Sequence, residues 1–268
     1  AGRGGVGGTS MRYVEVEGTR LHYRESGSGP LALFIHGFPH DHTMWLNQLE
    51  ALGGRRRCVA PDLRGFGLSD PTTTTLPMER HADDLAAFIG AVDGEQADVV
   101  ALSMGGYVAL ALWERHRELV RSLALVDTRA EADDAEGKQQ RDEAIERALS
   151  EGRQSLADQM LGQLLADAAD PTPRARLRSM VEGTRYETIV AAQRGMRDRP
   201  DRTHLLAAID VPTLIAVGEE DAVTPPEAMK AMADAVAGAR FVTVGGAGHM
   251  SPLEQPAVVN EILADFWD

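Results

Sequence analysis

The chain has 268 residues, and its hydrophobic share of 43% suits a folded globular protein with a sizeable core. Acidic residues outnumber basic ones by 41 to 27, so the net charge of −14 makes nucleic acid and anionic membrane surfaces poor partners. No apolar run approaches the ~20 residues of a membrane-spanning helix. Cys58 is the single cysteine, which excludes an internal disulfide and fits a cytoplasmic location. We expect Cys58 to be a small core residue.

Residues 1–10 are rich in glycine, and we expect them to form a tail ahead of Met11. Beyond Met11, short apolar runs predict eight strands, at residues 13–16, 21–24, 31–35, 57–60, 97–102, 122–126, 213–217 and 241–244. Apolar residues at helical spacing predict helices at residues 43–52, 79–92, 105–116 and 257–266. Alternation of strands and helices predicts an α/β fold, with a mostly parallel sheet and helices on both faces.

Residues 129–203 interrupt this alternation because they contain no convincing strand. They predict roughly four helices, separated near Gly152, Asp170-Pro171 and Gly183. We expect this segment to be a helical cap inserted after the sixth strand. Residues 11–128 and 204–268 would then form the core domain.

A serine stands where a predicted strand gives way to a predicted helix. Ser103 follows the apolar run 97–102, with the small residues Ala101 and Gly105 two positions before and after it. Bulky residues at those positions would collide with neighbouring elements in a sharp strand-to-helix turn, which is the pattern of a nucleophile elbow. Ala101 replaces the first glycine of the usual motif. The alternative is a buried serine that only caps the helix.

A serine nucleophile needs a base and an acid to orient that base. The loop after the predicted strand 213–217 contains Asp221, and the loop after strand 241–244 contains His249. Because the carboxyl ends of parallel strands share one edge of a sheet, we expect these side chains to meet Ser103 there.

The acid has rivals in the sequence. Glu219 and Glu220 lie next to Asp221, and Asp127 directly follows the predicted strand 122–126. We favour Asp221, because it completes the chain order Ser, Asp, His that is typical of one class of triad.

Taken together, these motifs closely resemble the α/β-hydrolase superfamily over residues 11–268, and they imply its eight-stranded sheet. The resemblance rests on five segments in the right order: residues 36–39 (His-Gly-Phe-Pro), residues 61–69 (Pro-Asp-Leu-Arg-Gly-Phe-Gly-Leu-Ser), the Ser103 turn, the Asp221 loop and the His249 loop. The chain is most similar to the cap-bearing esterases, enol-lactonases and carbon–carbon bond hydrolases. Epoxide hydrolases and haloalkane dehalogenases carry an aspartate where this chain has Ser103.

The resemblance implies a role for each residue. Ser103 would be the nucleophile, His249 the base and Asp221 its orienting acid, while the backbone N–H groups of Phe38 and Met104 would form the oxyanion hole. The implied activity is that of a carboxylic ester hydrolase that cleaves a small ester through an acyl-enzyme, without a cofactor.

Several alternatives stay open. A lactonase or carbon–carbon bond hydrolase would use the same triad, and a non-catalytic ligand-binding protein or a cofactor-free oxygenase or lyase would use the same fold. The sequence also leaves a homo-oligomer open.

Two further histidine motifs need an interpretation. His36 is expected to orient the oxyanion loop rather than to transfer protons. The run His40-Asp41-His42 resembles a metal site, but it lacks a further histidine at metallohydrolase spacing, and Asp41 makes a plausible helix N-cap. We therefore expect no metal there.

Overall fold

The computed structural model describes residues 12–268, so the expected tail at residues 1–10 lies outside the described residues. Within them the strands form one eight-stranded sheet in the order β1-β2-β4-β3-β5-β6-β7-β8. The strands are β1 (Arg12–Val16), β2 (Thr19–Ser26), β3 (Leu31–Ile35), β4 (Arg57–Pro61), β5 (Ala97–Leu102), β6 (Val120–Val126), β7 (Thr213–Gly218) and β8 (Arg240–Val244). The α-helices are α1 (Leu46–Leu52), α2 (Met78–Ala91), α3 (Met104–His116), α4 (Ala135–Leu164), α5 (Pro171–Gly183), α6 (Tyr186–Arg197), α7 (Pro226–Asp234), α8 (Ser251–Glu254) and α9 (Pro256–Trp267).

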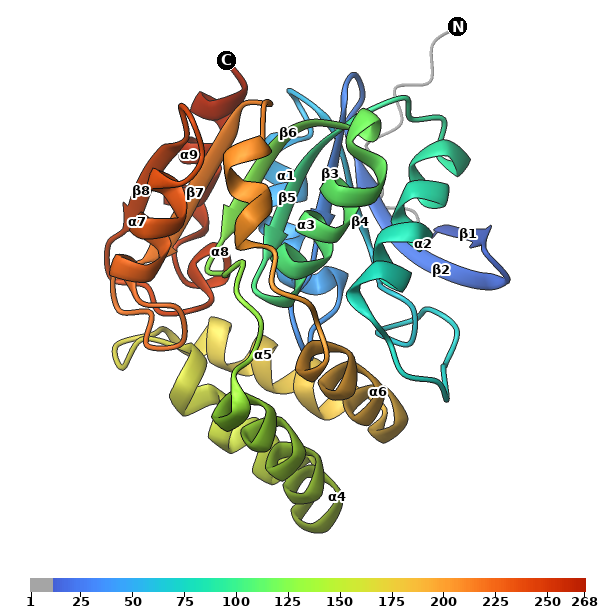
Figure 1. The fold of residues 1–268 in the computed structure, drawn as a ribbon, viewed down its shortest axis with the longest axis vertical. Coiled ribbons are helices and arrows are strands. Elements are labelled where there is room, and N and C mark those ends of the chain that lie inside the picture. Colours follow the sequence, from blue (N-terminus) through green and yellow to red (C-terminus); the bar gives the residue numbers. More distant parts are fainter. Residues whose placement is uncertain (1–11) are drawn as a thin grey trace, which may run out of the picture.

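The sheet is parallel from β4 to β8, and only the pairs β1–β2 and β2–β4 are antiparallel. Every residue of β3, β5 and β7 is buried, because helices flank the sheet on both faces. Helix α2 packs on α3, and α1 packs on α9 (Figure 1). The predicted eight-stranded, mostly parallel α/β fold is confirmed.

Cys58 is fully buried in β4, as expected of a small core residue, and burial raises its thiol pKa to about 12.

Helices α4, α5 and α6 follow β6 without an intervening strand, and we call them the helical insertion. Figure 1 shows them grouped beyond one edge of the sheet, at the end of the molecule opposite the C-terminus. Helix α4 is broken at Gly152, whose φ of 86° and ψ of 172° are not helical. The three predicted breaks, near residues 152, 170 and 183, are therefore all present.

Close backbone contacts seat the helical insertion on the core. A β-carbon on Gly195 of α6 would lie only 1.8 Å from the Leu76 carbonyl oxygen, so only glycine permits this approach. The Leu76 N–H also donates to the Ala191 carbonyl (3.2 Å). Beyond α6, the buried guanidinium of Arg202 forms ion pairs with Glu79 (2.5 Å) and Glu114 (3.0 Å). These contacts tie α6 and the segment after it to α2, to α3 and to the chain just before α2.

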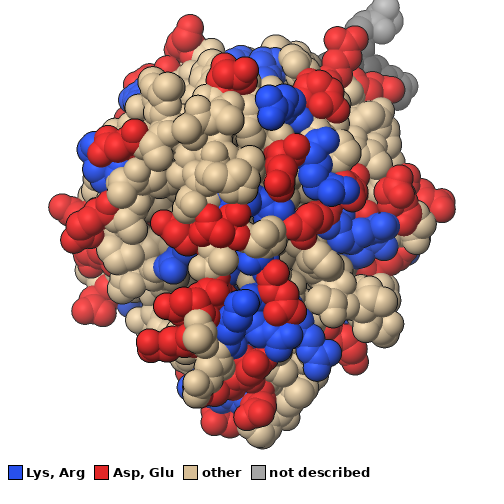
Figure 2. Space-filling view, viewed as in Figure 1, with Lys and Arg blue, Asp and Glu red and all other residues tan. Residues whose placement is uncertain are grey.

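Three local features differ from the sequence analysis, and one of them is the short helix α8, which was not predicted. The predicted helix at residues 43–52 begins as a tight 3₁₀ turn, η1 (His42–Trp45), before α1. Helix α7 packs on β7 and was not predicted, because a pair of prolines stands at its start and most of its residues are exposed. Among residues 12–268, no helix has the length and apolarity that crossing a membrane requires. On the face drawn in Figure 2, basic side chains are interspersed with acidic ones.

The fit of Gly195 yields a prediction. Gly195→Ala should lower the free energy of unfolding by about 1–3 kcal/mol, because the new methyl group must push α6 off residue 76. Gly162→Ala in α4 is the matched control, since nothing lies within 4 Å of its β-carbon position. The control should be neutral or stabilising by up to about 1 kcal/mol. Urea unfolding of both variants measures the difference, and equal stabilities would contradict the close contact.

Candidate active site

Ser103 occupies the turn between β5 and α3. Its backbone has φ 54° and ψ −118°, a strained conformation that costs a residue with a side chain about 1–3 kcal/mol. The Ser103 N–H donates to the Val126 carbonyl at the end of β6 (3.0 Å), and the Ser103 carbonyl accepts from the Gly106 N–H (2.8 Å). The Thr128 hydroxyl donates to the same carbonyl (2.7 Å). These bonds hold the turn against its strain.

Two glycines let α3 begin close to the sheet. A β-carbon on Gly105 would lie 2.5 Å from the Ile35 carbonyl oxygen, and one on Gly106 would lie 2.3 Å from the Thr128 hydroxyl. The prediction that a bulky residue two positions after Ser103 would collide with a neighbouring element is confirmed.

The structure brings Ser103, His249 and Asp221 into one chain of hydrogen bonds. The His249 Nε2 lies 2.8 Å from the Ser103 Oγ, and the His249 Nδ1 lies 2.8 Å from the Asp221 Oδ2. His249 and Asp221 are buried, whereas Ser103 is partly exposed. Because Asp221 accepts the proton on Nδ1, the opposite nitrogen is left to accept the serine proton. This arrangement can activate the hydroxyl as a nucleophile.

The loop after β7 surrounds the Asp221 carboxylate with donors. The N–H groups of Val223 (2.8 Å) and Thr224 (2.9 Å) donate to Oδ1, and the Thr224 hydroxyl donates to Oδ2. Burial alone would raise the pKa of Asp221, but the hydrogen bonds from His249 and Thr224 outweigh it and hold this pKa below its ordinary value. Asp221 is therefore ionised at neutral pH.

The rival acids have other partners. Asp127 accepts from the Gly218 N–H (2.7 Å) and from the Ser251 hydroxyl (2.6 Å), so it links the end of β7 to the start of α8. Burial, and next the nearby charge of Asp221, raise the pKa of Asp127 well above its ordinary value. Glu219 and Glu220 are exposed.

The loop after β3 carries the expected second oxyanion donor. Among residues 12–268, no protein acceptor binds the N–H of Phe38, and the N–H of Met104 is at the first position of α3, where a helix offers no acceptor. Neither N–H group therefore has a protein acceptor among these residues. His36 is fully buried: its Nδ1 lies 2.8 Å from the Gly37 carbonyl, and its Nε2 accepts from the Leu63 N–H (3.0 Å). Burial lowers the pKa of His36, which favours the neutral ring. His36 thus holds the loop after β3 through hydrogen bonds, as predicted.

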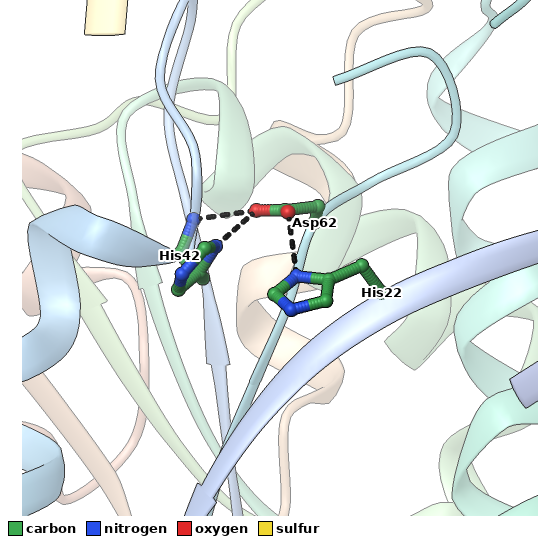
Figure 3. Close-up of side chains that lie close together, drawn as sticks. All are labelled: His22, His42 and Asp62. Atoms are coloured by element: carbon green, nitrogen blue, oxygen red, sulfur yellow. Dashed lines mark hydrogen bonds and ion pairs between the residues drawn. The ribbon is translucent and has the colours of Figure 1, made fainter. Parts of the chain in front are cut away.

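The histidine and acid side chains that cluster in the structure are not those of the run His40-Asp41-His42. They are His22, His42 and Asp62. Figure 3 shows His42 and His22, not His40, on either side of Asp62. The Nδ1 atoms of His22 and His42 lie 2.9 and 2.8 Å from its two oxygens. Each oxygen also accepts a backbone N–H, from His42 (2.7 Å) and Leu68 (2.9 Å). These four hydrogen bonds occupy the lone pairs that a metal would need, so the group is a hydrogen-bonded carboxylate.

The neighbours of this cluster have separate roles. Asp41 accepts from the Thr43 N–H (2.8 Å) and caps η1, as predicted. His40 is buried, and its two ring nitrogens have no hydrogen-bond partner among the described residues. Burial lowers the pKa of His40 well below its ordinary value, which keeps the ring neutral.

A cavity of about 840 Å³ lies between α4 and the loop that follows Asp221. Ala222 and Val223 line it beside Tyr107, which is one helical turn along α3 from Ser103. Its other walls are mostly polar and include Arg129 and Gln193. Ser103, His249 and Asp221 do not themselves line this cavity, which adjoins the loop after Asp221 and is large enough to admit a small molecule.

A parallel α/β sheet with a serine at such a turn and a histidine and an acid on later loops defines the class of α/β-hydrolases. The chain belongs to the alpha/beta hydrolase family, whose sequence model matches residues 32–262. It is 31% identical to the AB hydrolase superfamily protein YisY of Bacillus subtilis, over 95% of this chain and 98% of that protein.

Solved structures give the same class. A thermophilic esterase from Thermogutta terrifontis, determined with malate bound, is 37% identical with a TM-score of 0.92, over 96% of this chain and 98% of that one. The enol-lactonase from Burkholderia xenovorans is 28% identical with a TM-score of 0.87, over 96% and 99%. The 2-hydroxymuconate semialdehyde hydrolase of a Pseudomonas species is 27% identical in sequence, over 95% and 93%.

The strained turn yields a prediction for position 103. Ser103→Gly should unfold with a free energy about 1 kcal/mol higher than that of Ser103→Ala, because only the alanine keeps a β-carbon at φ 54°. Both variants lose the same hydroxyl, so the comparison isolates the backbone. Urea unfolding of the two proteins measures it, and an alanine variant as stable as the glycine variant would show that the turn is unstrained.

The Asp62 cluster predicts a dependence of stability on pH. The hydrogen bonds from His22 and His42 outweigh burial and hold the pKa of Asp62 well below its ordinary value. The contribution of the ionised Asp62 to the free energy of unfolding is therefore fully present above ~3.9, the pKa of an aspartate in the unfolded chain. It is lost as the pH falls toward the lower pKa of Asp62 in the folded protein. Asp62→Asn should cost about 3 kcal/mol at pH 7, and less at pH 3.

Urea unfolding at pH 7 and pH 3 measures this effect. Asp210→Asn is the control, because Asp210 is exposed and should change stability by less than about 0.5 kcal/mol at either pH. A loss that is equally large at both pH values would contradict an ionised Asp62.

Proposed function

We propose that this protein is a serine hydrolase that cleaves a small carboxylic ester through an acyl-enzyme. The single observation that carries the proposal is the hydrogen-bonded chain from Ser103 through His249 to Asp221 at the β5–α3 turn. The 37% identity to an esterase over almost the whole chain favours an ester as the substrate.

In the proposed reaction, the Ser103 Oγ attacks the carbonyl carbon of the ester while its proton passes to the His249 Nε2. Asp221 stabilises the imidazolium that forms. The N–H groups of Phe38 and Met104 would stabilise the oxyanion of the tetrahedral intermediate, and each such donor is typically worth about 3 kcal/mol. The intermediate collapses, and the departing alkoxide takes the proton from His249, which leaves the acyl group on Ser103.

Water completes the cycle. It attacks the acyl carbon and gives its proton to His249, which returns a proton to Ser103 as the carboxylic acid leaves. Apart from the ester and water, only side chains and backbone groups of this chain take part in the scheme. The helical insertion would act as a cap, with the polar cavity between α4 and the Asp221 loop as the place where substrate groups lie.

A second candidate is hydrolysis of a lactone or of a carbon–carbon bond. Identities of 28% to an enol-lactonase and 27% to a 2-hydroxymuconate semialdehyde hydrolase favour it, because both comparisons span nearly the whole chain. These reactions differ from ester cleavage in the contacts made to the substrate. A panel of aryl esters, alkyl esters and lactones separates ester hydrolysis from lactone hydrolysis.

The proposal predicts the behaviour of Ser103→Ala. A fluorophosphonate probe should phosphonylate Ser103 of the parent protein with loss of fluoride, and the variant should not be labelled. Turnover of the best ester should fall by about 10³-fold or more, since the nucleophile is absent.

Ser179→Ala is the matched control, because Ser179 is an exposed serine of α5, and it should keep parental labelling and turnover. Full labelling or turnover by Ser103→Ala would contradict the assignment. Tight binding without turnover of any ester or lactone would instead indicate a ligand-binding protein.

A further inference from the structure

Glu254, the last residue of α8, accepts hydrogen bonds from both chain neighbours of His249. Its Oε1 lies 3.0 Å from the Gly248 nitrogen and 3.3 Å from the Met250 nitrogen, and both N–H groups donate to it. The chain thus folds back so that one oxygen holds the residue before His249 and the residue after it. This side chain therefore bonds to the peptide groups of residues 247–248 and 249–250, on either side of His249.

The other oxygen of Glu254 faces the helical insertion. The Ala166 N–H, two residues beyond the end of α4, donates to Oε2 (2.8 Å). The two backbones are also in direct contact here, because a β-carbon on Gly248 would lie 2.7 Å from the Ala166 nitrogen and 2.9 Å from the Leu165 carbonyl carbon. One carboxylate therefore bridges the insertion and the His249 loop where they touch.

The surroundings of Glu254 suit a carboxylate that accepts backbone hydrogen bonds rather than one that pairs with a basic side chain. Glu254 has no basic side chain within ion-pair distance among the described residues. Burial raises the pKa of Glu254, against the three backbone N–H groups that lower it, and Glu220 adds a further upward effect. The carboxylate is kept in this partly buried place by backbone donors from two separate segments. A side chain with a single acceptor oxygen can serve only one of those segments.

We propose that Glu254 is a positioning residue that couples the seating of the helical insertion to the orientation of His249. The proposal rests on the proposed role of His249 as the base. When the insertion moves away from the core, Ala166 leaves Oε2, and the side chain that held Gly248 and Met250 loses one of its anchors. The base is then aligned with Ser103 only while the insertion is seated.

Glu219 provides a matched control on the same loop. Its Oε2 accepts from the Gly246 N–H (3.3 Å), three residues before His249, and its side chain is exposed. Glu219→Gln and Glu254→Gln therefore remove equal charge close to one loop. Only the second change breaks the bridge to the insertion.

The experiment compares the parent, Glu254→Gln and Glu219→Gln in three measurements: kcat and KM on the best ester, the rate of fluorophosphonate labelling, and amide hydrogen exchange. Glu254→Gln should lower kcat and the labelling rate by about tenfold or more, with KM changed less than kcat, because the base is misplaced while the binding surface remains. Exchange should rise in two separate segments, residues 164–168 and 247–251. Glu219→Gln should stay within about twofold of the parent and change exchange only near residue 246.

Each result has a defined meaning. Parental labelling and kcat in Glu254→Gln would overturn the proposal, and so would a rise in exchange confined to residues 247–251, because the coupling would then be absent. If the glutamine variant does not fold, Glu254→Asp replaces it: the shorter side chain cannot span both segments, and the same two-segment rise is expected. If the parent itself is not labelled, the proposed function fails, whereas the exchange measurement still decides whether the two segments are coupled.

Discussion

The backbone at Ser103 is the constraint on which the rest of the site depends. Strand β5 turns into α3 at a residue with φ 54°, and this turn persists because β6 and the first turn of α3 both bond to it. The close start of α3 in turn requires glycine at positions 105 and 106. The turn places the Ser103 hydroxyl at the carboxyl ends of the parallel strands. The loops after β7 and β8 start at the same edge of the sheet, so they need only supply an acid and a base.

Those loops have little regular structure, and buried or partly buried acidic side chains hold them in place by hydrogen bonds instead. Asp221 accepts N–H groups within its own loop, Asp127 joins that loop to Ser251, and Glu254 holds both neighbours of His249. Each acid offers several acceptor sites to backbone donors that no strand or helix satisfies. The acidic residues of this chain thus include a group that is internal and that replaces secondary structure around the candidate site.

The strands could be predicted from the sequence because β3, β5, β6 and β7 are almost continuous apolar runs, as strands covered on both faces must be. The grouping of Ser103, Asp221 and His249 could be predicted because Ser103 and Asp221 follow such strands and His249 follows the shorter, less buried strand β8. Contacts between residues that are far apart in the chain could not be predicted, because they leave no pattern in the local sequence. His22 stands 40 residues before Asp62, so only the folded sheet could show that it, rather than His40, shares this carboxylate with His42. The partners of Asp127 and Glu254 were hidden for the same reason.

The contact at Gly248 has a consequence for how such proteins diversify. The residue before His249 and the chain at residues 164–166 occupy adjoining space without room for one added carbon atom. The helical insertion therefore cannot be exchanged for that of a relative as an independent module. A transplanted insertion would have to bring the same backbone path at this point, or the loop that carries His249 would have to be exchanged with it. Recombination between family members should succeed most often when the crossover keeps these two segments from the same parent.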